Sequence, residues 1–364
     1  MKVNAFITHK KAEQFIDCQD RFSVNCDTKS IALSDGMGST WQQKIWARIL
    51  VTKFTQSESL ILDQNNVKEL SDDWYKSVYG FIEKLKLDNA QQNIIYRNER
   101  NLAGGMSAGA TFVGVRLVDK RWKGNVLGDS CLIVWDEGNA NFFTSQNTDE
   151  FDSFPDYFDS NKQKHGRGTP KNIDIEVKEN ETILLVSDPF SDFLLERKKE
   201  GAIKQYISKL INLNSHEEFE NLVEEWRILG MHNDDTTLIV VKHSSDSSNL
   251  EEGIVDDIEK EIEREEKERE IRKEAERNAK EEAERNAKET VERQNENQEN
   301  KQEQTVVIDD VEKFLELIKE ELITSVKNII YSKNFKKLRH GDKANVLVSD
   351  VFKCLKREFV KYKK

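Results

Sequence analysis

Five aspartates stand where an apolar segment of this 364-residue chain begins or ends: Asp20, Asp35, Asp129, Asp188 and Asp234. Asp35 is the clearest of them, because it ends the mostly apolar run 31–34 and is followed by Gly36 and Gly38. Each aspartate alone is typical of a turn, but together they predict carboxylates that converge at one edge of a sheet. Such oxygen ligands suit hard divalent cations, and no His or Cys spacing in the chain indicates zinc.

The elements that would position these carboxylates are predicted from apolar periodicity. Strands are expected at residues 4–8, 21–26, 29–34, 110–118, 121–127, 131–136, 182–186 and 236–241. Helical spacing is found over residues 41–55, 68–87, 190–196, 202–211 and 217–229. Residues 144–172 lack periodicity, so we expect an irregular segment there, and the whole pattern predicts an α+β fold.

Composition divides the chain into three parts. Residues 1–245 resemble an ordinary folded domain, residues 246–304 are mostly charged or amide side chains, and residues 305–364 regain apolar residues at helical spacing. The net charge of −12 is spread so unevenly that it says little about partners. Four cysteines without metal-binding spacing fit a reducing compartment, and no long apolar run is found, so we expect a cytoplasmic protein without membrane contact.

The charged part is predicted to form a helical spacer. Many Glu side chains precede a Lys or Arg by four residues, as Glu263 does Lys267, which stabilises an exposed helix by roughly 0.2–0.5 kcal/mol per pair. Small apolar residues recur every four positions, which gives no heptad seam and favours a single helix over a coiled coil. A polar break is expected at residues 294–305, followed by a small helical bundle that docks on a partner or self-associates. The basic C-terminal end lacks interleaved aromatic residues, so a nucleic-acid partner is not favoured.

The order of the motifs resembles the metal-dependent protein phosphatase family, type 2C. The matching segments are Cys18-Gln19-Asp20-Arg21-Phe22, Ser34-Asp35-Gly36-Met37-Gly38-Ser39, Gly109-Ala110-Thr111, Gly128-Asp129-Ser130, Val186-Ser187-Asp188 and Asp234-Asp235-Thr236-Thr237. The resemblance covers residues 1–245 and is closest to bacterial members, because Met37 stands where animal members usually carry His. It implies an α-β-β-α sandwich of two mainly antiparallel sheets flanked by helices. It also implies hydrolysis of phosphoserine or phosphothreonine in a protein substrate, in opposition to a cognate Ser/Thr kinase.

The resemblance assigns roles to individual residues. Asp35 would bridge two Mg²⁺ or Mn²⁺ ions, the Gly36 carbonyl would bind one ion, and Asp188 and Asp234 would hold the other. Asp20 would orient water bound to the metals. Two such ions lower the pKa of a bridging water and neutralise charge on the phosphoryl group, so no Ser or Cys nucleophile is needed. Asp129 is interpreted as a structural turn residue.

Some positions depart from the family pattern. Phe15 falls where many members carry a phosphate-binding Arg, so Lys10, Lys11 and Arg21 are the candidates to replace it. Asp192 is the candidate ligand of a third metal, although its usual Asp partner falls near Met106 here. These departures leave an alternative open, in which the domain is a weakly active or inactive scaffold that binds partners through its helical tail. A purely structural spacer protein is the third option.

Overall fold

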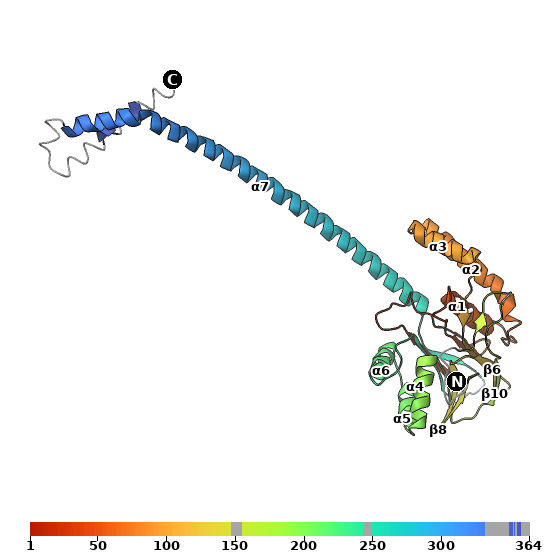
Figure 1. Ribbon diagram of the computed structural model, residues 1–364. Helices are drawn as coiled ribbons and strands as arrows, with labels where there is room; N and C mark the ends of the chain where they lie inside the picture. The colour runs from red at the N-terminus through yellow and green to blue at the C-terminus, as the bar shows by residue number, and fades with distance from the viewer. Residues whose placement is uncertain (147–154, 243–248, 332–348, 352, 354, 358–364) are drawn as a thin grey trace. The chain divides into compact units, whose positions relative to one another are not determined.

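The computed structural model describes residues 1–146, 155–242 and 249–331, and, near the C-terminus, 349–351, 353 and 355–357. Two large sheets lie at the centre of the N-terminal part (Figure 1). The six-stranded sheet has the order β13-β1-β12-β11-β7-β8, and the five-stranded sheet has the order β10-β6-β5-β3-β2. All pairs in these sheets are antiparallel except β1 with β13, which are parallel. A third sheet is the short pair β4-β9.

The strands have the following bounds: β1 (Lys2–Thr8), β2 (Arg21–Asn25), β3 (Ser30–Ser34), β4 (Gly109–Ala110), β5 (Phe112–Val118), β6 (Arg121–Leu127), β7 (Cys131–Asp136), β8 (Asn139–Phe143), β9 (Phe158–Asp159), β10 (Lys171–Glu176), β11 (Glu181–Val186), β12 (Thr236–Lys242) and β13 (Glu251–Val255). The helices are α1 (Gln43–Gln56), α2 (Val67–Leu87), α3 (Gln92–Ala103), α4 (Asp188–Lys199), α5 (Ile203–Ile211), α6 (His216–Ile228) and α7 (Ile258–Tyr331).

The cores follow from the two-residue period of the strands, which sends successive side chains to opposite faces of a sheet. In β11, Leu184 and Val186 pack against α4, α5 and α6, whereas Ile183 and Leu185 face the other sheet. The far face of the five-stranded sheet is covered by α1 and α2, around a buried cluster that includes Trp46. The predicted α-β-β-α sandwich is therefore confirmed.

Four strands and one helix were not predicted from the sequence: β8, β9, β10, β13 and α3. Two of the strands, β9 and the start of β10, lie in the segment expected to be irregular, of which residues 147–154 are outside the described residues. The compact N-terminal unit extends from Met1 to Arg269, beyond the boundary expected at residue 245, because β13 pairs with β1 and the start of α7 packs on the same unit.

The second unit comprises Glu270–Lys364. The polar break expected at residues 294–305 is wrong, because α7 is one continuous helix of 74 residues. No Gly or Pro occurs between residues 254 and 340, and the Glu and Gln side chains that fill the expected break are good helix formers. The second predicted amphipathic helix of this region, residues 344–360, falls largely outside the described residues.

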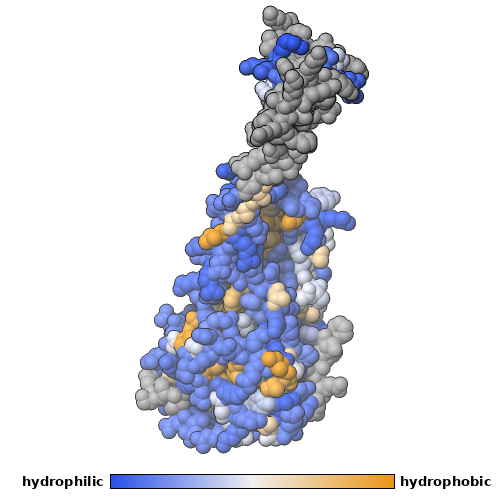
Figure 2. Space-filling model, turned by 90° about the vertical axis from the view of Figure 1, so that its left-hand side faces the viewer, coloured by the Kyte–Doolittle hydropathy of each residue, from blue (hydrophilic) through white to orange (hydrophobic). Residues whose placement is uncertain are grey.

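The surface is mostly hydrophilic on the face drawn in Figure 2, where hydrophobic residues form separate small groups. Across the described residues, no helix is long and apolar enough to cross a membrane.

Candidate metal centre

The three aspartates that the sequence associates with metal lie at the ends of β3, β11 and β12. Strands β11 and β12 are antiparallel neighbours with Val186 opposite Leu238, so the end of one and the start of the other meet at the same sheet edge. Asp188 therefore begins α4 close to Asp234, which precedes β12. Asp35 follows β3 in the other sheet and is held by backbone: its carbonyl accepts a hydrogen bond from Thr111 N at 2.9 Å.

A glycine with positive φ brings a fourth aspartate to this edge. Gly128 has φ of +103° between β6 and β7, and a Cβ there would lie 2.7 Å from the Thr111 side chain. Only glycine fits this turn without strain. The turn places Asp129 beside the ends of β3 and β11.

These groups line one cavity of about 600 Å³. Its wall is formed by Lys10, Gln19, Asp35, Gly36, Met37, Gly38, Ser39, Asp129, Pro155, Asp188, Asp192, His232, Asn233 and Asp234. All four residues predicted as metal ligands, Asp35, Gly36, Asp188 and Asp234, are thus brought together. Asp129, which the sequence placed among the converging carboxylates but interpreted as a structural turn residue, also lines this cavity and is a further candidate ligand.

Burial and mutual repulsion raise the pKa of three carboxyls that line the cavity, Asp35, Asp129 and Asp188. Removal from solvent raises the pKa of Asp35 and Asp188 well above the ordinary range, and neighbouring aspartates raise it further. Burial raises the pKa of Asp129 to about 6. A divalent cation would favour the ionised forms of all three, because its positive charge attracts carboxylates and offsets their mutual repulsion.

Asp20 lies behind this cavity rather than in its wall. Its side chain is fully buried, and its Oδ2 accepts a hydrogen bond of 2.7 Å from the Thr237 hydroxyl. Its Oδ1 has no hydrogen-bond partner. Burial, followed by the negative charge of Asp235, raises the pKa of Asp20 to about 7. The position fits a group that acts on the site through water.

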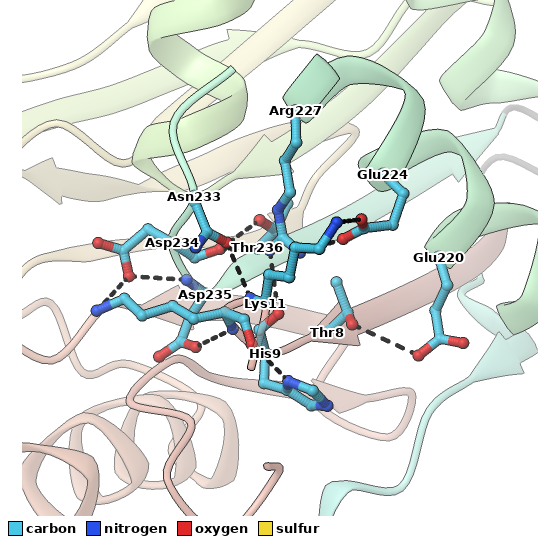
Figure 3. Close-up of polar contacts among 11 residues, drawn as sticks. Thr8, His9, Lys11, Glu220, Glu224, Arg227, Asn233, Asp234, Asp235 and Thr236 are labelled. Atoms are coloured by element: carbon cyan, nitrogen blue, oxygen red, sulfur yellow. Dashed lines mark hydrogen bonds and ion pairs between the residues drawn. The ribbon is translucent and has the colours of Figure 1, made fainter. Parts of the chain in front are cut away.

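Asp235 was not singled out from the sequence, yet it joins the two sides of the site. Its Oδ1 accepts a hydrogen bond from Lys10 N at 3.0 Å, and its Oδ2 accepts one from Gln19 N at 2.7 Å. Figure 3 shows Asp234 and Asp235 beside the loop that begins at His9. The adjacent acids Asp234 and Asp235 are visible in the sequence as a candidate part of a site. The sequence does not indicate that Asp234 points into the cavity and Asp235 toward the loop.

The three candidate phosphate-binding cations have different surroundings. Lys10 lines the cavity, and its Nζ lies 2.8 Å from Asp234 Oδ1. Lys11 is directed away, with its Nζ 2.9 Å from Glu224 and its backbone N bound to Asn233 (Figure 3). Arg21 is not among the residues of this cavity. It is buried, and its Nη1 donates to the carbonyls of Cys18 and Asp20.

The third-metal candidate also lies in the cavity wall. Asp192 Oδ2 is 3.7 Å from the Nε2 atom of His232, an exposed residue of the same wall. Met106, at the position of the usual Asp partner, is 43% exposed and is not part of the wall.

The donor set fits a hard divalent cation. It consists of carboxylate oxygens and the Gly36 carbonyl, and Asp20 and Asp129 each retain a buried oxygen without a hydrogen-bond partner. Within the described residues, no three His, Cys, Asp or Glu side chains already lie close enough together to hold a metal ion, so the carboxylates are spread around the cavity. An open arrangement suits Mg²⁺, which usually keeps several of its waters.

Comparison with known families agrees with this geometry. The protein phosphatase 2C family model matches residues 9–226, which is more than half of the chain. The chain therefore belongs to the protein phosphatase 2C family.

Solved structures of low sequence identity resemble the chain. A bacterial serine phosphatase is 17% identical with a TM-score of 0.44, and the match covers 67% of this chain and 98% of that one. Serine/threonine phosphatase Stp1 from Staphylococcus aureus is 16% identical with a TM-score of 0.44, over 67% and 95% of the two chains. The catalytic domain of PstP, in complex with two manganese ions, is 14% identical with a TM-score of 0.37, over 65% and 96%. Sequence comparison with curated proteins found no match.

Proposed function

We propose that this protein is a metal-dependent phosphatase that hydrolyses phosphoserine or phosphothreonine in proteins. The observation that carries the proposal is the single cavity lined by Asp35, Gly36, Asp188 and Asp234, in a chain of the protein phosphatase 2C family. Asp35 and Gly36 would hold one Mg²⁺ or Mn²⁺ ion, and Asp35, Asp188 and Asp234 the second. The two ions, when bound, would supply an attacking water of lowered pKa and neutralise charge on the phosphoryl group.

The chain's own groups would bind and orient the reactants. Asp20 is fixed by Thr237, and its second oxygen is unpaired, so it can accept a proton from a water that bridges it to the cavity. Lys10 carries the only ammonium group among the residues that line the cavity, all of which are described. We assign Lys10 the contact with a phosphate oxygen. Its ammonium group now pairs with Asp234 and would be free to make that contact once Asp234 binds a metal ion.

The proposal extends to partners and to the tail. A cytoplasmic phosphoprotein is the expected substrate, and a Ser/Thr kinase the opposing enzyme. We retain a helical spacer, shortened to residues 270–304 of α7, and a small helical region, residues 305–364, that binds a partner or self-associates. Asp192 is retained as the candidate ligand of a third ion.

A scaffold function is the second candidate, and one observation favours it. Phe15, which replaces the phosphate-binding Arg of many relatives, is 2% exposed in a cluster with Ile7 and Cys18, so no cation occupies that position. A scaffold would bind partners without turnover.

The deciding experiment is hydrolysis of p-nitrophenyl phosphate and of a phosphothreonine peptide by the full chain. It is run with Mn²⁺, with Mg²⁺ and with chelator, and with the variants Asp35→Asn and Asp188→Asn. Asp136→Asn, an exposed aspartate at the end of β7, is the matched control. Turnover that needs metal, disappears in both site variants and survives in the control supports the phosphatase. A folded protein that binds Mn²⁺ in calorimetry but hydrolyses neither compound would favour the scaffold.

A further inference from the structure

The first three turns of α7 pack against the loop that leads into the metal centre. Ile258 and Ile262 contact a small apolar cluster made by Ile7, Phe15 and Cys18. These turns belong to the same compact unit as the site, since that unit ends at Arg269 (Figure 1). The loop itself is the segment 9–20, which joins β1 to β2.

Glu265 holds this loop by two consecutive backbone amides. Its Oε1 accepts a hydrogen bond from Phe15 N at 3.0 Å, and its Oε2 accepts one from Ile16 N at 3.3 Å. One turn further along α7, Arg269 donates to the Gln14 side chain. Hydrogen bonds to an ionised acceptor are stronger than neutral ones, so this carboxylate is a well-placed clamp for the middle of the loop.

The opposite side of the loop belongs to the metal centre. Asp235 accepts hydrogen bonds from Lys10 N and Gln19 N, near the two ends of the loop. The same loop carries the Lys10 ammonium group, at 2.8 Å from Asp234, and the buried Asp20. The loop is therefore held at both ends by the site and in the middle by α7.

We propose that Glu265 is a positioning residue that sets the loop 9–20, and with it Lys10 and Asp20, through the amides of Phe15 and Ile16. For its effect on turnover the proposal rests on the proposed phosphatase function. Glu265 does not line the cavity and touches no reacting group. Its influence passes through the backbone of the loop.

Through this arrangement, a change in the position of α7 would affect the metal centre. The helix that carries Glu265 continues without a break to Tyr331. A partner that binds the tail and draws the first turns of α7 away from the loop would remove the clamp. Phosphate binding would then weaken because Lys10 lies on the loop, and metal binding would weaken because Asp20, which would orient the metal-bound water, lies at its end.

The test compares three variants of the full chain. Glu265→Ala removes both acceptor oxygens, and Glu265→Gln keeps one neutral acceptor at nearly the same size, which protects the fold. Glu263→Ala is the matched control, because Glu263 is an exposed glutamate of the same helix, whereas Glu266 lines a cavity that includes Ile16 of the loop. Hydrogen exchange is measured by mass spectrometry on peptides covering residues 12–18, together with KM, kcat and the Mn²⁺ dissociation constant.

We expect Glu265→Ala to speed exchange in this segment about tenfold or more, with a smaller effect for Glu265→Gln and none for Glu263→Ala. We also expect KM for the phosphothreonine peptide and the Mn²⁺ dissociation constant to rise roughly three- to tenfold, with kcat changed less. Unchanged exchange in Glu265→Ala would overturn the clamp. Faster exchange with unchanged KM and Mn²⁺ affinity would overturn its positioning role. If the wild-type chain hydrolyses no phosphate, the proposed phosphatase fails, whereas exchange and Mn²⁺ affinity still test the clamp.

Discussion

Without metal, the protein should lose stability as the pH rises from 5 to 8. Several buried carboxyls cause this loss, and Asp20 is one whose contribution can be sized, because burial and Asp235 raise its pKa in the fold from 3.8 to about 7. In the unfolded chain this carboxyl loses its proton near pH 4, so between pH 4 and 7 the folded state binds more protons than the unfolded state. The free energy of unfolding therefore falls across this interval.

The size of the effect follows from the two pKa values. A difference from 3.8 to about 7 corresponds to about 4 kcal/mol in total, of which about 3 kcal/mol is lost between pH 5 and pH 8. The pKa of His216 is raised by its hydrogen bond to Asp256, and this pair also loses stability as pH rises. Asp20→Asn leaves the His216 pair in place but removes the Asp20 carboxyl and its repulsion of Asp35 and Asp188, so the difference between the two proteins reports Asp20 together with that repulsion.

The assay is urea unfolding followed by tryptophan fluorescence at pH 5, 6, 7 and 8 with chelator present. The wild-type protein should lose about 3 kcal/mol more than Asp20→Asn over this range. Saturating Mn²⁺ should remove most of the loss, because the metal binds the ionised carboxylates. Equal pH dependence in the two proteins, or a wild-type stability that rises with pH in chelator, would refute the reasoning.

Three other perturbations have defined outcomes. Lys10→Met should change the free energy of unfolding by less than about 1 kcal/mol, because the ion pair of Lys10 with Asp234 is partly exposed. The KM for the phosphothreonine peptide should rise, and a large loss of stability would contradict the assignment of Lys10 to phosphate binding. Gly124→Ala should cost about 3 kcal/mol or more in urea unfolding, since a Cβ there would lie 1.9 Å from the Gly114 carbonyl oxygen. Gly138→Ala is its control, because a Cβ at Gly138 meets nothing within 4 Å, and equal losses would count against the packing argument. Asp188→Asn should raise the metal-free thermal midpoint while abolishing turnover, and a lowered midpoint would show that the ionised carboxylate stabilises the fold.

The central strands of the fold could be predicted, because a strand that is buried on both faces has a nearly continuous run of apolar residues. Strands β11 and β12 are covered on both faces, so their sequences are nearly continuous apolar segments, and the aspartates at their ends stand out. Strand β13 could not be found this way. Its residues Glu251–Val255 are exposed or half-buried, and what places it in the sheet is backbone pairing with β1, which does not depend on side-chain hydrophobicity.

The sequence indicated which residue types form the site, but it did not indicate the direction in which each side chain points. Asp35, Asp188 and Asp234 were selected because each follows or precedes a strand, and the structure places all three in the wall of one cavity. Asp129 was taken as a brace, because a Gly-Asp-Ser turn has the same sequence whether its carboxylate faces protein or cavity. Arg21 was considered for phosphate because of its charge, whereas its guanidinium is buried on backbone carbonyls.

The cost of the acidic cavity bears on the choice between enzyme and scaffold. The cavity and its surroundings hold Asp35, Asp129 and Asp188 with pKa values raised by burial and by one another, which opposes folding at neutral pH. A scaffold that binds partners through α7 gains nothing from these charges, since asparagines would fill the same space without repulsion. Bound divalent cations offset the cost, and clustered carboxylates around them are what a two-metal hydrolase requires. The acidic cavity therefore favours the phosphatase, even though Phe15, which the family resemblance places at the phosphate-binding position, carries no charge.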